Sequence, residues 1–254
     1  LFFGYHPQRF AVGIEVNPDM QRRGIGGMLY DRIMKELADL GAKVATPLVL
    51  ASDFQSAKGI KFAASRGYVE KRRTIESKLD LERLDLNQLK KATERMAEEG
   101  ISIADFASET RGDASAGRKL KDLEDSGAQD VPGAIADAPM DFHDYEIITL
   151  RSPIIDWKGS FVAKSGDAFV GESSLLKSGI EGTLDQGFTV VRPGFRGKGI
   201  AQAVKASVAS YAKSRGARLI RTHNDAENAP MLSINRKLGF VKQAEWIAFE
   251  KELP

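Results

Sequence analysis

The clearest place for chemistry in this sequence is a strand that runs into a glycine-rich turn and then a helix, from Val191 to Ala201. Gly197 and Gly199 lie in the turn, next to Arg196 and Lys198. The first amides of a helix have no intrahelical partner, and the helix dipole places positive charge there. Glycines let the backbone approach a ligand closely. The pattern therefore predicts an anion site that suits a pyrophosphate.

Two common phosphate-binding motifs are absent. No stretch reads G-x-x-x-x-G-K-[ST], and the dinucleotide pattern G-x-G-x-x-G/A fails because Gln202 occupies its third glycine position. The pattern that remains, [QR]-x-x-G-x-[GA], occurs at Gln21–Gly26 and again at Arg196–Ala201. Simple strand-to-helix connectors remain an alternative for both turns.

The repeated turn belongs to a longer internal repeat. Val16–Gly26 aligns without gaps with Val191–Ala201, 175 residues later, and Ser65–Tyr68 parallels Lys237–Phe240 at an offset of 172. Each copy reads strand, turn, helix, strand, helix, Gly-aromatic pair, strand. Self-similarity of this kind indicates two related structural units.

Hydrophobic periodicity gives the elements of each copy. In the first copy we expect strands at 10–16, 43–50 and 69–79 and helices at 24–40 and 55–65. In the second copy we expect strands at 184–191, 218–222 and 241–250 and helices at 199–215 and 228–238. The apolar stripe of the first helix is Ile25, Met28, Leu29, Ile33, Leu37 and Leu40, and that of its counterpart is Ile200, Ala203, Val204, Val208, Tyr211 and Ala212.

The second copy has a long front section that the first lacks. It should hold helices at 87–99 and 142–150, a hairpin of strands 160–165 and 168–176, and a loop over 111–133 with one short helix at 118–124. We therefore expect residues 1–80 to be a partial N-terminal domain, the C-terminal half of a fold, and residues 81–254 to be the complete domain. The first unit is either truncated or a shortened accessory unit.

A second motif follows the second turn. Thr222–Met231 leads through Asn235 to Leu238-Gly239-Phe240, and Asn228 suits the N-cap of the last helix. Together with Arg196–Ala201, these residues resemble the GNAT superfamily of acyl-CoA N-acyltransferases, over 142–252 and more loosely over 10–80. The similarity is greatest to the tandem type. It implies an α/β fold with a mixed sheet whose strands 184–191 and 218–222 are parallel and separate at their C-terminal ends.

The resemblance also implies acetyl-CoA as cosubstrate. The pantetheine arm would pair with the strand in the gap, as an added strand does, and the pyrophosphate would lie on the turn. The expected cofactor-binding residues are Val190, Val191, Arg196, Gly197, Lys198, Gly199, Ile200, Ala201, Asn224 and Asn228. A backbone N–H near Val191 would hold the oxyanion.

Acyl transfer to an amine needs a base, because a Lys-like amine has a pKa near ~10.4 and is protonated at neutral pH. Glu172 and Asp185 are the leading candidates, and Glu181 is a third; burial would raise the pKa of the one that acts. The family's usual acid, a Tyr four residues before the Gly-aromatic pair, is replaced by Asn235. Asn235 would instead hydrogen-bond the thioester sulfur or the pantetheine.

Composition limits the remaining classes. The chain has 254 residues, a net charge of +2, no cysteine and three widely spaced histidines, so we expect no metal site and no nucleic-acid or membrane partner. We expect a cytoplasmic enzyme and leave a homodimer open. The leading function is N-acetyl transfer to a small-molecule or peptide amine. The alternatives are a catalytically weak CoA-binding sensor or regulatory module and a tandem whose two sites have decayed.

Overall fold

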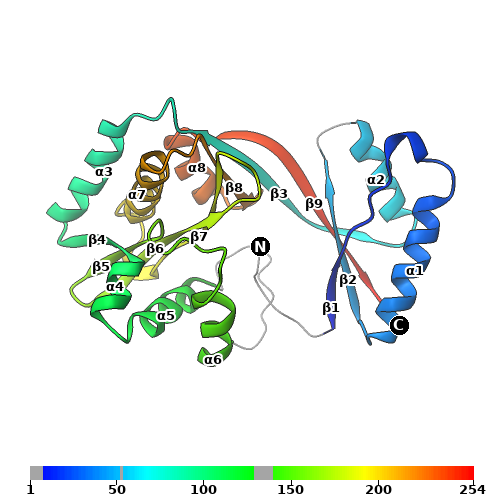
Figure 1. The fold of residues 1–254 in the computed structure, drawn as a ribbon, viewed down its shortest axis with the longest axis horizontal. Helices are drawn as coiled ribbons and strands as arrows, with labels where there is room; N and C mark the ends of the chain where they lie inside the picture. Colours follow the sequence, from blue (N-terminus) through cyan, green and yellow to red (C-terminus); the bar gives the residue numbers. More distant parts are fainter. Residues whose placement is uncertain (1–7, 52–53, 129–139) are drawn as a thin grey trace. The chain divides into compact units, whose positions relative to one another are not determined.

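The computed structural model describes residues 8–51, 54–128 and 140–254. They form two compact units (Figure 1). Of the described residues, 76–128, 140–224 and 228–243 belong to the C-terminal unit, and 8–51, 54–75, 225–227 and 244–254 belong to the N-terminal unit. Two long strands, β3 (Val69–Asp80) and β9 (Val241–Glu252), contribute residues to both units. The units therefore differ from the expected domains at the last strand, because its second half packs with the N-terminal residues.

The sheet of the C-terminal unit is mixed. Its strands are β4 (Ile101–Asp105), β5 (Phe161–Ser165), β6 (Ala168–Lys177), β7 (Thr183–Val191) and β8 (Leu219–Asp225). They lie in the order β8-β7-β6-β5-β4, with β3 beyond β8. The pairs from β4 to β7 are antiparallel, whereas β7 and β8 are parallel. This confirms the expected mixed sheet and the parallel pair.

Helices cover both faces of this sheet, as Figure 1 shows. On one face lie α3 (Leu86–Glu98) and α7 (Ile200–Ser214), and on the other α4 (Phe106–Gly112) and α5 (Ala116–Ala128). Next along the chain from α5 come α6 (Phe142–Tyr145) and a π-helical turn over Glu146–Leu150. The last helix is α8 (Ala229–Lys237).

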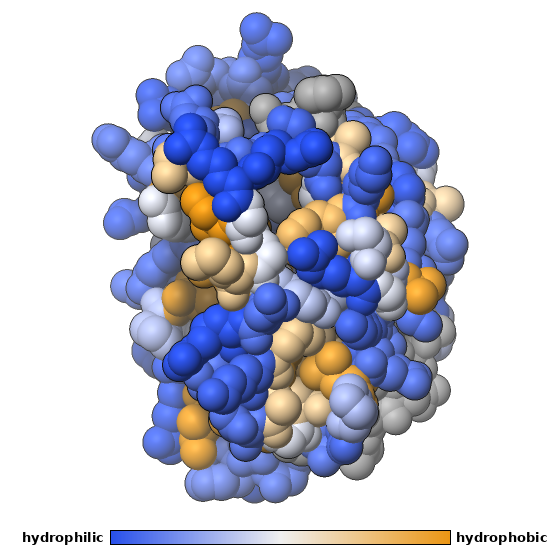
Figure 2. Space-filling view, turned by 90° about the vertical axis from the view of Figure 1, so that its right-hand side faces the viewer, coloured by the Kyte–Doolittle hydropathy of each residue, from blue (hydrophilic) through white to orange (hydrophobic). Residues whose placement is uncertain are grey.

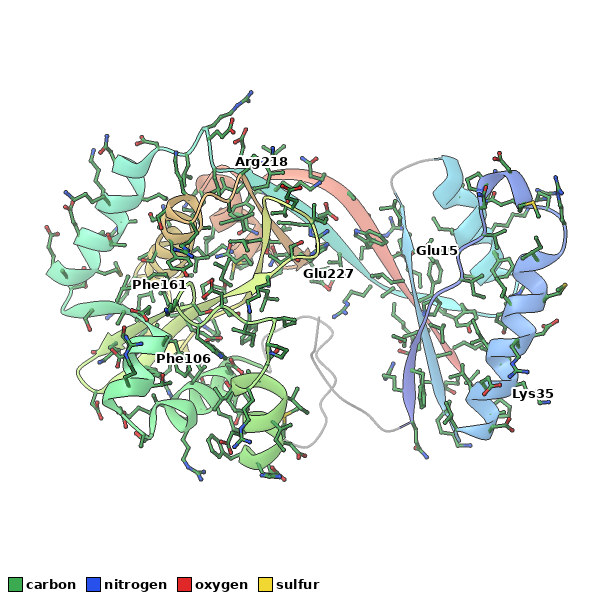
Figure 3. The ribbon with its side chains drawn as sticks, in the orientation of Figure 1. Glu15, Lys35, Phe106, Phe161, Arg218 and Glu227 are labelled. Atoms are coloured by element: carbon green, nitrogen blue, oxygen red, sulfur yellow. The ribbon has the colours of Figure 1, made fainter. Side chains whose placement is uncertain are left out.

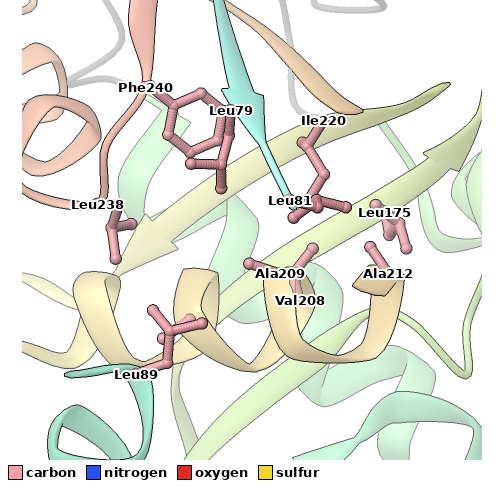
Figure 4. Close-up of a cluster of buried hydrophobic side chains, with 11 residues drawn as sticks. Leu79, Leu81, Leu89, Leu175, Val208, Ala209, Ala212, Ile220, Leu238 and Phe240 are labelled. Atoms are coloured by element: carbon pink, nitrogen blue, oxygen red, sulfur yellow. The ribbon is translucent and has the colours of Figure 1, made fainter. Parts of the chain in front are cut away.

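The core beneath α7 has the apolar stripe that the sequence predicted. Ile200, Ala203, Val204, Val208 and Ala212 are all buried, and Tyr211 is half-buried. Figure 4 shows the part of this core in which Val208, Ala209 and Ala212 meet Leu175 and Ile220 of the sheet and Leu89 of α3. Burial of such side chains contributes about 1.5–3 kcal/mol each before entropy is counted. A separate cluster, in which Ile200, Ala203 and Val204 pack with Ala163 and Val170 of the sheet, holds the start of α7.

Four strands contribute to the sheet of the N-terminal unit, and two of them, β9 and β3, belong to it only in part. Here β1 (Arg9–Val12) is parallel to β2 (Val44–Leu50), and β2 is antiparallel to β9. Its helices are α1 (Ile25–Asp39) and α2 (Phe54–Ala64). The predicted stripe on α1 is wrong in three places, because Met28, Leu29 and Leu40 are exposed. The helix instead packs through Tyr30, Ile33, Met34 and Leu37. Figure 2 shows the face around α1 as largely hydrophilic with scattered apolar residues.

Three elements of the front section do not follow from the sequence pattern. We expected a loop with one short helix, but α5 has 13 residues and α4 precedes it; residues 129–133 lie outside the described part. Strand β4 was not predicted either; its Asp105 pairs with Phe161 of β5. Phe106, the first residue of α4, packs on Trp157 with ring centroids 4.7 Å apart (Figure 3). Such contacts between distant residues leave no local sequence signal.

Candidate active site

The parallel strands β7 and β8 separate partway along their length. Their register covers four pairs, from Thr183–Leu219 to Gln186–Thr222. Strand β7 continues to Val191 and β8 continues to Asp225. The gap opens toward the C-terminal ends of both strands, as the sequence analysis expected. A wedge of this kind exposes backbone groups of β7 to which an extended ligand can bind.

A bulge in β7 lies just beyond the last paired residue. Gln186 pairs with Leu175 of β6 and Thr189 pairs with Ser173, so two residues of β7 oppose one of β6. Gly187 fits this bulge because a Cβ there would lie 2.6 Å from Ser174 Oγ. Bulges bend a strand and increase its twist. This one accounts for the departure of β7 from β8.

The glycine-rich turn joins β7 to α7. Gly197 and Gly199 have φ angles of 79° and 88°, the left-handed region that glycine adopts without strain. Among the described residues, no protein acceptor lies in hydrogen-bonding position for the amides of residues 197–202. The turn is exposed, and Arg196 Nε binds Val191 O at 3.0 Å. The amides and their partial positive charge therefore fit a phosphate group.

The turn before α1 has the same conformation. Gly24 has φ 82° and ψ −11°, against 88° and 5° for Gly199. Gln21 has φ −66° and ψ 161°, against −68° and 159° for Arg196. Arg22, at φ 64°, occupies the position of Gly197 and is the one non-glycine residue in the described chain with a positive φ. The sequence similarity between the two turns thus extends to their backbone.

A hollow of about 230 Å³ lies beside the start of α7. Gly199 and Gln202 form one side, and Lys91, Ala92, Arg95 and Met96 of α3 form the other. Lys91 and Arg95 are four residues apart and therefore share one face of the helix. They place two cations beside the glycine-rich turn, and sequence reasoning missed both. The sequence placed a helix here but contained no sign that it packs along α7.

Three asparagines lie around the end of β8. Asn235 is buried, with 2% exposure, and its Nδ2 donates to Asn224 Oδ1 at 2.6 Å. Its Oδ1 has no hydrogen-bond partner among the described residues. Asn228 caps α8, accepting from Met231 N at 3.1 Å, as expected. Asn224 and Asn235 therefore act as a pair that leaves one buried acceptor for a ligand's N–H.

The two candidate bases have different environments. Asp185 belongs to the paired part of β7 and binds Arg221 through two bonds of 2.7 and 2.9 Å. Glu172 of β6 is 2% exposed and lies opposite Val190 of β7, beyond the strand separation. Burial, with repulsion from Glu124, raises the pKa of Glu172 well above its usual range. A raised pKa suits a base that must accept a proton near neutral pH.

A buried lysine also lies at the closed end of the wedge. Lys205 of α7 is 2% exposed, and its Nζ donates to Gln186 Oε1 at 2.7 Å. Gln186 Nε2 in turn donates to Ser173 Oγ at 2.9 Å. Burial lowers the pKa of Lys205 to about 7. The sequence analysis missed this residue, although a lysine at position 205 interrupts the apolar face of the helix.

Three further features of the described residues concern acidic clusters, His223 and helix length. In the ranges 8–51, 54–128 and 140–254, no three acidic or histidine side chains converge as a metal site would require. His223, just past the last paired residue of β8, lies 3.4 Å from Glu76 Oε2, in keeping with a hydrogen-bonding role. None of the described helices combines the length and apolar character needed to cross a bilayer.

Comparisons with known proteins agree with this geometry. The acetyltransferase (GNAT) family profile matches residues 134–240. A GCN5-related N-acetyltransferase from Sphaerobacter thermophilus has a similar structure, with a TM-score of 0.74 and 19% identity over 96% of this chain and 73% of that one. A tandem GNAT protein from the clavulanic acid biosynthesis pathway gives a TM-score of 0.69 and 22% identity over 96% and 75%.

A glucosamine N-acetyltransferase region of a fungal GH3 β-N-acetylglucosaminidase gives a TM-score of 0.70 and 17% identity over 93% of this chain and 29% of that one. No curated protein matches the sequence. Sequence identities this low establish only the fold, so the similarity to the family is inferred from the profile match. The separating parallel strands, the bulge and the glycine-rich turn all lie within the matched range. Residues 134–240 thus match the acetyltransferase (GNAT) family, whose chemistry is acyl transfer.

Proposed function

We propose that the protein is an N-acetyltransferase that transfers an acetyl group from acetyl-CoA to a primary amine of a small molecule or peptide. The working site is in the C-terminal unit, and the N-terminal unit is a partial repeat of the same fold. The observation that carries the proposal is the combination of the β7–β8 wedge with unpartnered amides at the start of α7. The wedge would take the pantetheine arm, and the unpartnered amides would take the diphosphate.

The residues present fit the cosubstrate. The amides of residues 197–202 would hold the diphosphate, with Arg196, Lys198, Lys91 and Arg95 contributing positive charge. Val190 and Val191 would pair with the pantetheine arm, and the free Oδ1 of Asn235 would accept one of its N–H groups. Acetyl-CoA supplies an activated acyl group in its thioester. With the arm bound along β7, the thioester would lie near Glu172, which is opposite Val190, and Glu172 would accept the amine's proton.

Asp185 fits the role of base less well. Both oxygens of its carboxylate are already bound by the guanidinium of Arg221 on the neighbouring strand, so neither is free to take a proton from a substrate amine. It belongs to the closed end of the wedge, where it joins β7 to β8. We therefore assign Glu172 as the base and Asp185 to the support of the strand pair.

The test is turnover of acetyl-CoA with a panel of primary amines: spermidine, glucosamine and a peptide with a free N-terminus. Release of free CoA that depends on one of these amines, together with its acetylated product, supports the proposal. Tight CoA binding with no turnover of any amine would favour a sensor or regulatory module. Absence of CoA binding would contradict both.

A further inference from the structure

Three polar side chains from three elements meet on the α5 face of the sheet. Glu172 comes from β6, Glu124 from α5 and Tyr145 from α6. Glu172 and Tyr145 are 2% and 4% exposed, and Glu124 is partly buried. The carboxyls of Glu124 and Glu172 lie close enough to interact, and they can share a hydrogen bond when one of them is protonated. The Tyr145 hydroxyl lies close to both carboxyls.

Two carboxyls this close and this buried do not both ionise readily. Burial, followed by repulsion from Glu124, raises the pKa of Glu172, and burial raises the pKa of Glu124 to about 7. Both pKa values are raised, so the pair can hold one proton and one negative charge under conditions in which two separate Glu side chains would both be ionised. The nearby charges, Lys121 and Asp125 of α5, pair with each other, with Lys121 Nζ 5.9 Å from the Tyr145 ring centroid.

The group also has unused hydrogen-bonding capacity. Glu172 Oε1 and Tyr145 Oη are buried and have no hydrogen-bond partner among the described residues. Buried polar atoms are nearly always satisfied, so two orphans in one cluster indicate a missing donor. Both atoms can accept, and a primary ammonium group carries three N–H donors. Its single positive charge also matches the single negative charge of the carboxyl pair.

The cluster lies beside the strand that carries the wedge. Glu172 pairs in register with Val190 of β7. Helix α5 packs closely on the same valine, since a Cβ at Gly127 would lie 2.1 Å from Val190 Cγ2. The cluster is therefore adjacent to the part of β7 that, under the proposed function, presents the thioester.

We propose that Glu124, Glu172 and Tyr145 form one site that binds the acceptor's primary ammonium group and removes its proton. This inference rests on the proposed function. The ionised carboxyl takes one proton from R–NH3⁺, and the pair then holds two protons. The nitrogen lone pair forms a C–N bond to the thioester carbonyl carbon, and the C–S bond breaks with its electrons on sulfur. A second nitrogen proton goes to the thiolate, and the pair returns its proton to water.

The site selects cationic primary amines over hydroxyl acceptors. An alcohol brings one donor and no charge, so it would leave an orphaned acceptor and an uncompensated carboxylate. A trimethylated amine brings the charge without a donor. The expected substrate class is thus a compound with an unsubstituted amino group that is protonated in solution.

Direct observation of the carboxyls tests this without turnover. In protein labelled with carbon-13 at Glu side-chain carboxyls, hexylamine should shift the resonances of Glu172 and Glu124, while 1-hexanol should leave them unchanged. Glu124→Gln should abolish the response of Glu172. A control, Glu109→Gln, removes an ion-paired carboxylate on α4 and should leave it intact. Equal shifts with amine and alcohol, or none with amine, would overturn the proposal.

Kinetics with the best amine of the panel give the second readout. Glu172→Gln and Glu124→Gln should each lower kcat by about 100-fold or more, and Glu124→Gln should move the acid limb of the kcat/KM–pH profile. Tyr145→Phe should raise KM more than it lowers kcat. A Glu124→Gln enzyme with unchanged kcat and pH profile would contradict the shared site. If no amine is turned over while hexylamine still shifts the carboxyl resonances, the proposed function fails and the ammonium site stands.

Discussion

Lys205 Nζ donates to Gln186 Oε1 at 2.7 Å, directly beneath the last residue pair before β7 and β8 separate. An ammonium group in so buried a position is costly unless a carboxylate compensates it, and its recorded partner is a neutral amide. Lys205 Nζ also lies 5.3 Å from the ring centroid of Phe240. The lysine is therefore the buried base whose protonation most affects this end of the sheet.

Stability should rise with pH because of Lys205. Burial lowers its pKa to about 7, against about 10.4 in the unfolded chain. Between these values the unfolded chain binds more protons than the folded one, so the destabilisation is fully present below pH 7 and disappears as the pH rises toward 10.4. Each pKa unit corresponds to about 1.4 kcal/mol, so the total is on the order of several kcal/mol.

Urea denaturation of wild type and Lys205→Met from pH 7 to 10 measures this slope. The wild-type free energy of unfolding should increase over the range, and the variant should lack this increase whatever its absolute stability. The exposed Lys90→Met is the matched control and should keep the wild-type slope. Parallel curves for wild type and Lys205→Met would show that the lysine is not buried as described.

Asp185→Asn should separate the two candidate bases. Because the carboxylate is bound by Arg221 across the closed end of the wedge, its loss should cost about 1 kcal/mol of stability and change kcat by no more than a few-fold. Glu172→Gln should show the opposite pattern, with a large fall in kcat and little loss of stability. Thermal melts and steady-state kinetics on both variants check this. A larger kcat effect from Asp185→Asn would reverse the assignment.

Lys91 and Arg95 should contribute to CoA affinity. Both line the hollow beside Gly199, and charge-assisted bonds to phosphate are worth about 1.5–3 kcal/mol each. Lys91→Ala and Arg95→Ala should therefore each weaken CoA binding by about tenfold or more at low salt, measured by calorimetry. Lys90→Ala, on the same helix but outside the hollow, should have little effect. Equal CoA affinities for all three variants would show that Lys91 and Arg95 of α3 do not contact the phosphates.

Gly171→Ala should move the start of α7. A Cβ at this position would lie 2.5 Å from Ile200 Cγ2, too close for either side chain to remain in place. We expect a stability loss of about 1–3 kcal/mol, measured by thermal melts, together with weaker CoA binding, measured by calorimetry. Gly179→Ala has open space around its Cβ and serves as the control. Unchanged CoA affinity in Gly171→Ala would mean that the helix start does not hold the ligand.

The sequence predicted the elements that carry strong local signals. Gly197 and Gly199 marked the turn. The residues predicted for the apolar stripe of α7 are buried or half-buried, but the prediction did not include the buried Lys205. Exposed Met28, Leu29 and Leu40 show the limit of the method, since periodicity does not reveal which apolar residues a neighbouring element covers. The sequence also contained no sign that β9 contributes residues to both units, because the sequence of a strand does not determine which strands it pairs with.

The candidate site was predictable to a similar degree. Glu172 was a candidate from its place near the hairpin, but Glu124 and Tyr145 were not, because they meet it only when α5 and α6 pack on the sheet. Asp185 was an equal candidate until its bond with Arg221 was seen. Lys91 and Arg95 had the spacing of one helix face, and only the packing of α3 along α7 brings them to the turn.

The most direct test of the account is CoA binding by Gly199→Val, compared with Gly24→Val. Both glycines cap a helix in the left-handed region, at φ 88° and 82°, so a β-branched residue strains both turns equally. Calorimetry should show that Gly199→Val weakens CoA binding by at least about tenfold, or about 1.4 kcal/mol, while Gly24→Val binds as wild type does. Wild-type affinity in Gly199→Val would contradict the assignment of the diphosphate to the start of α7.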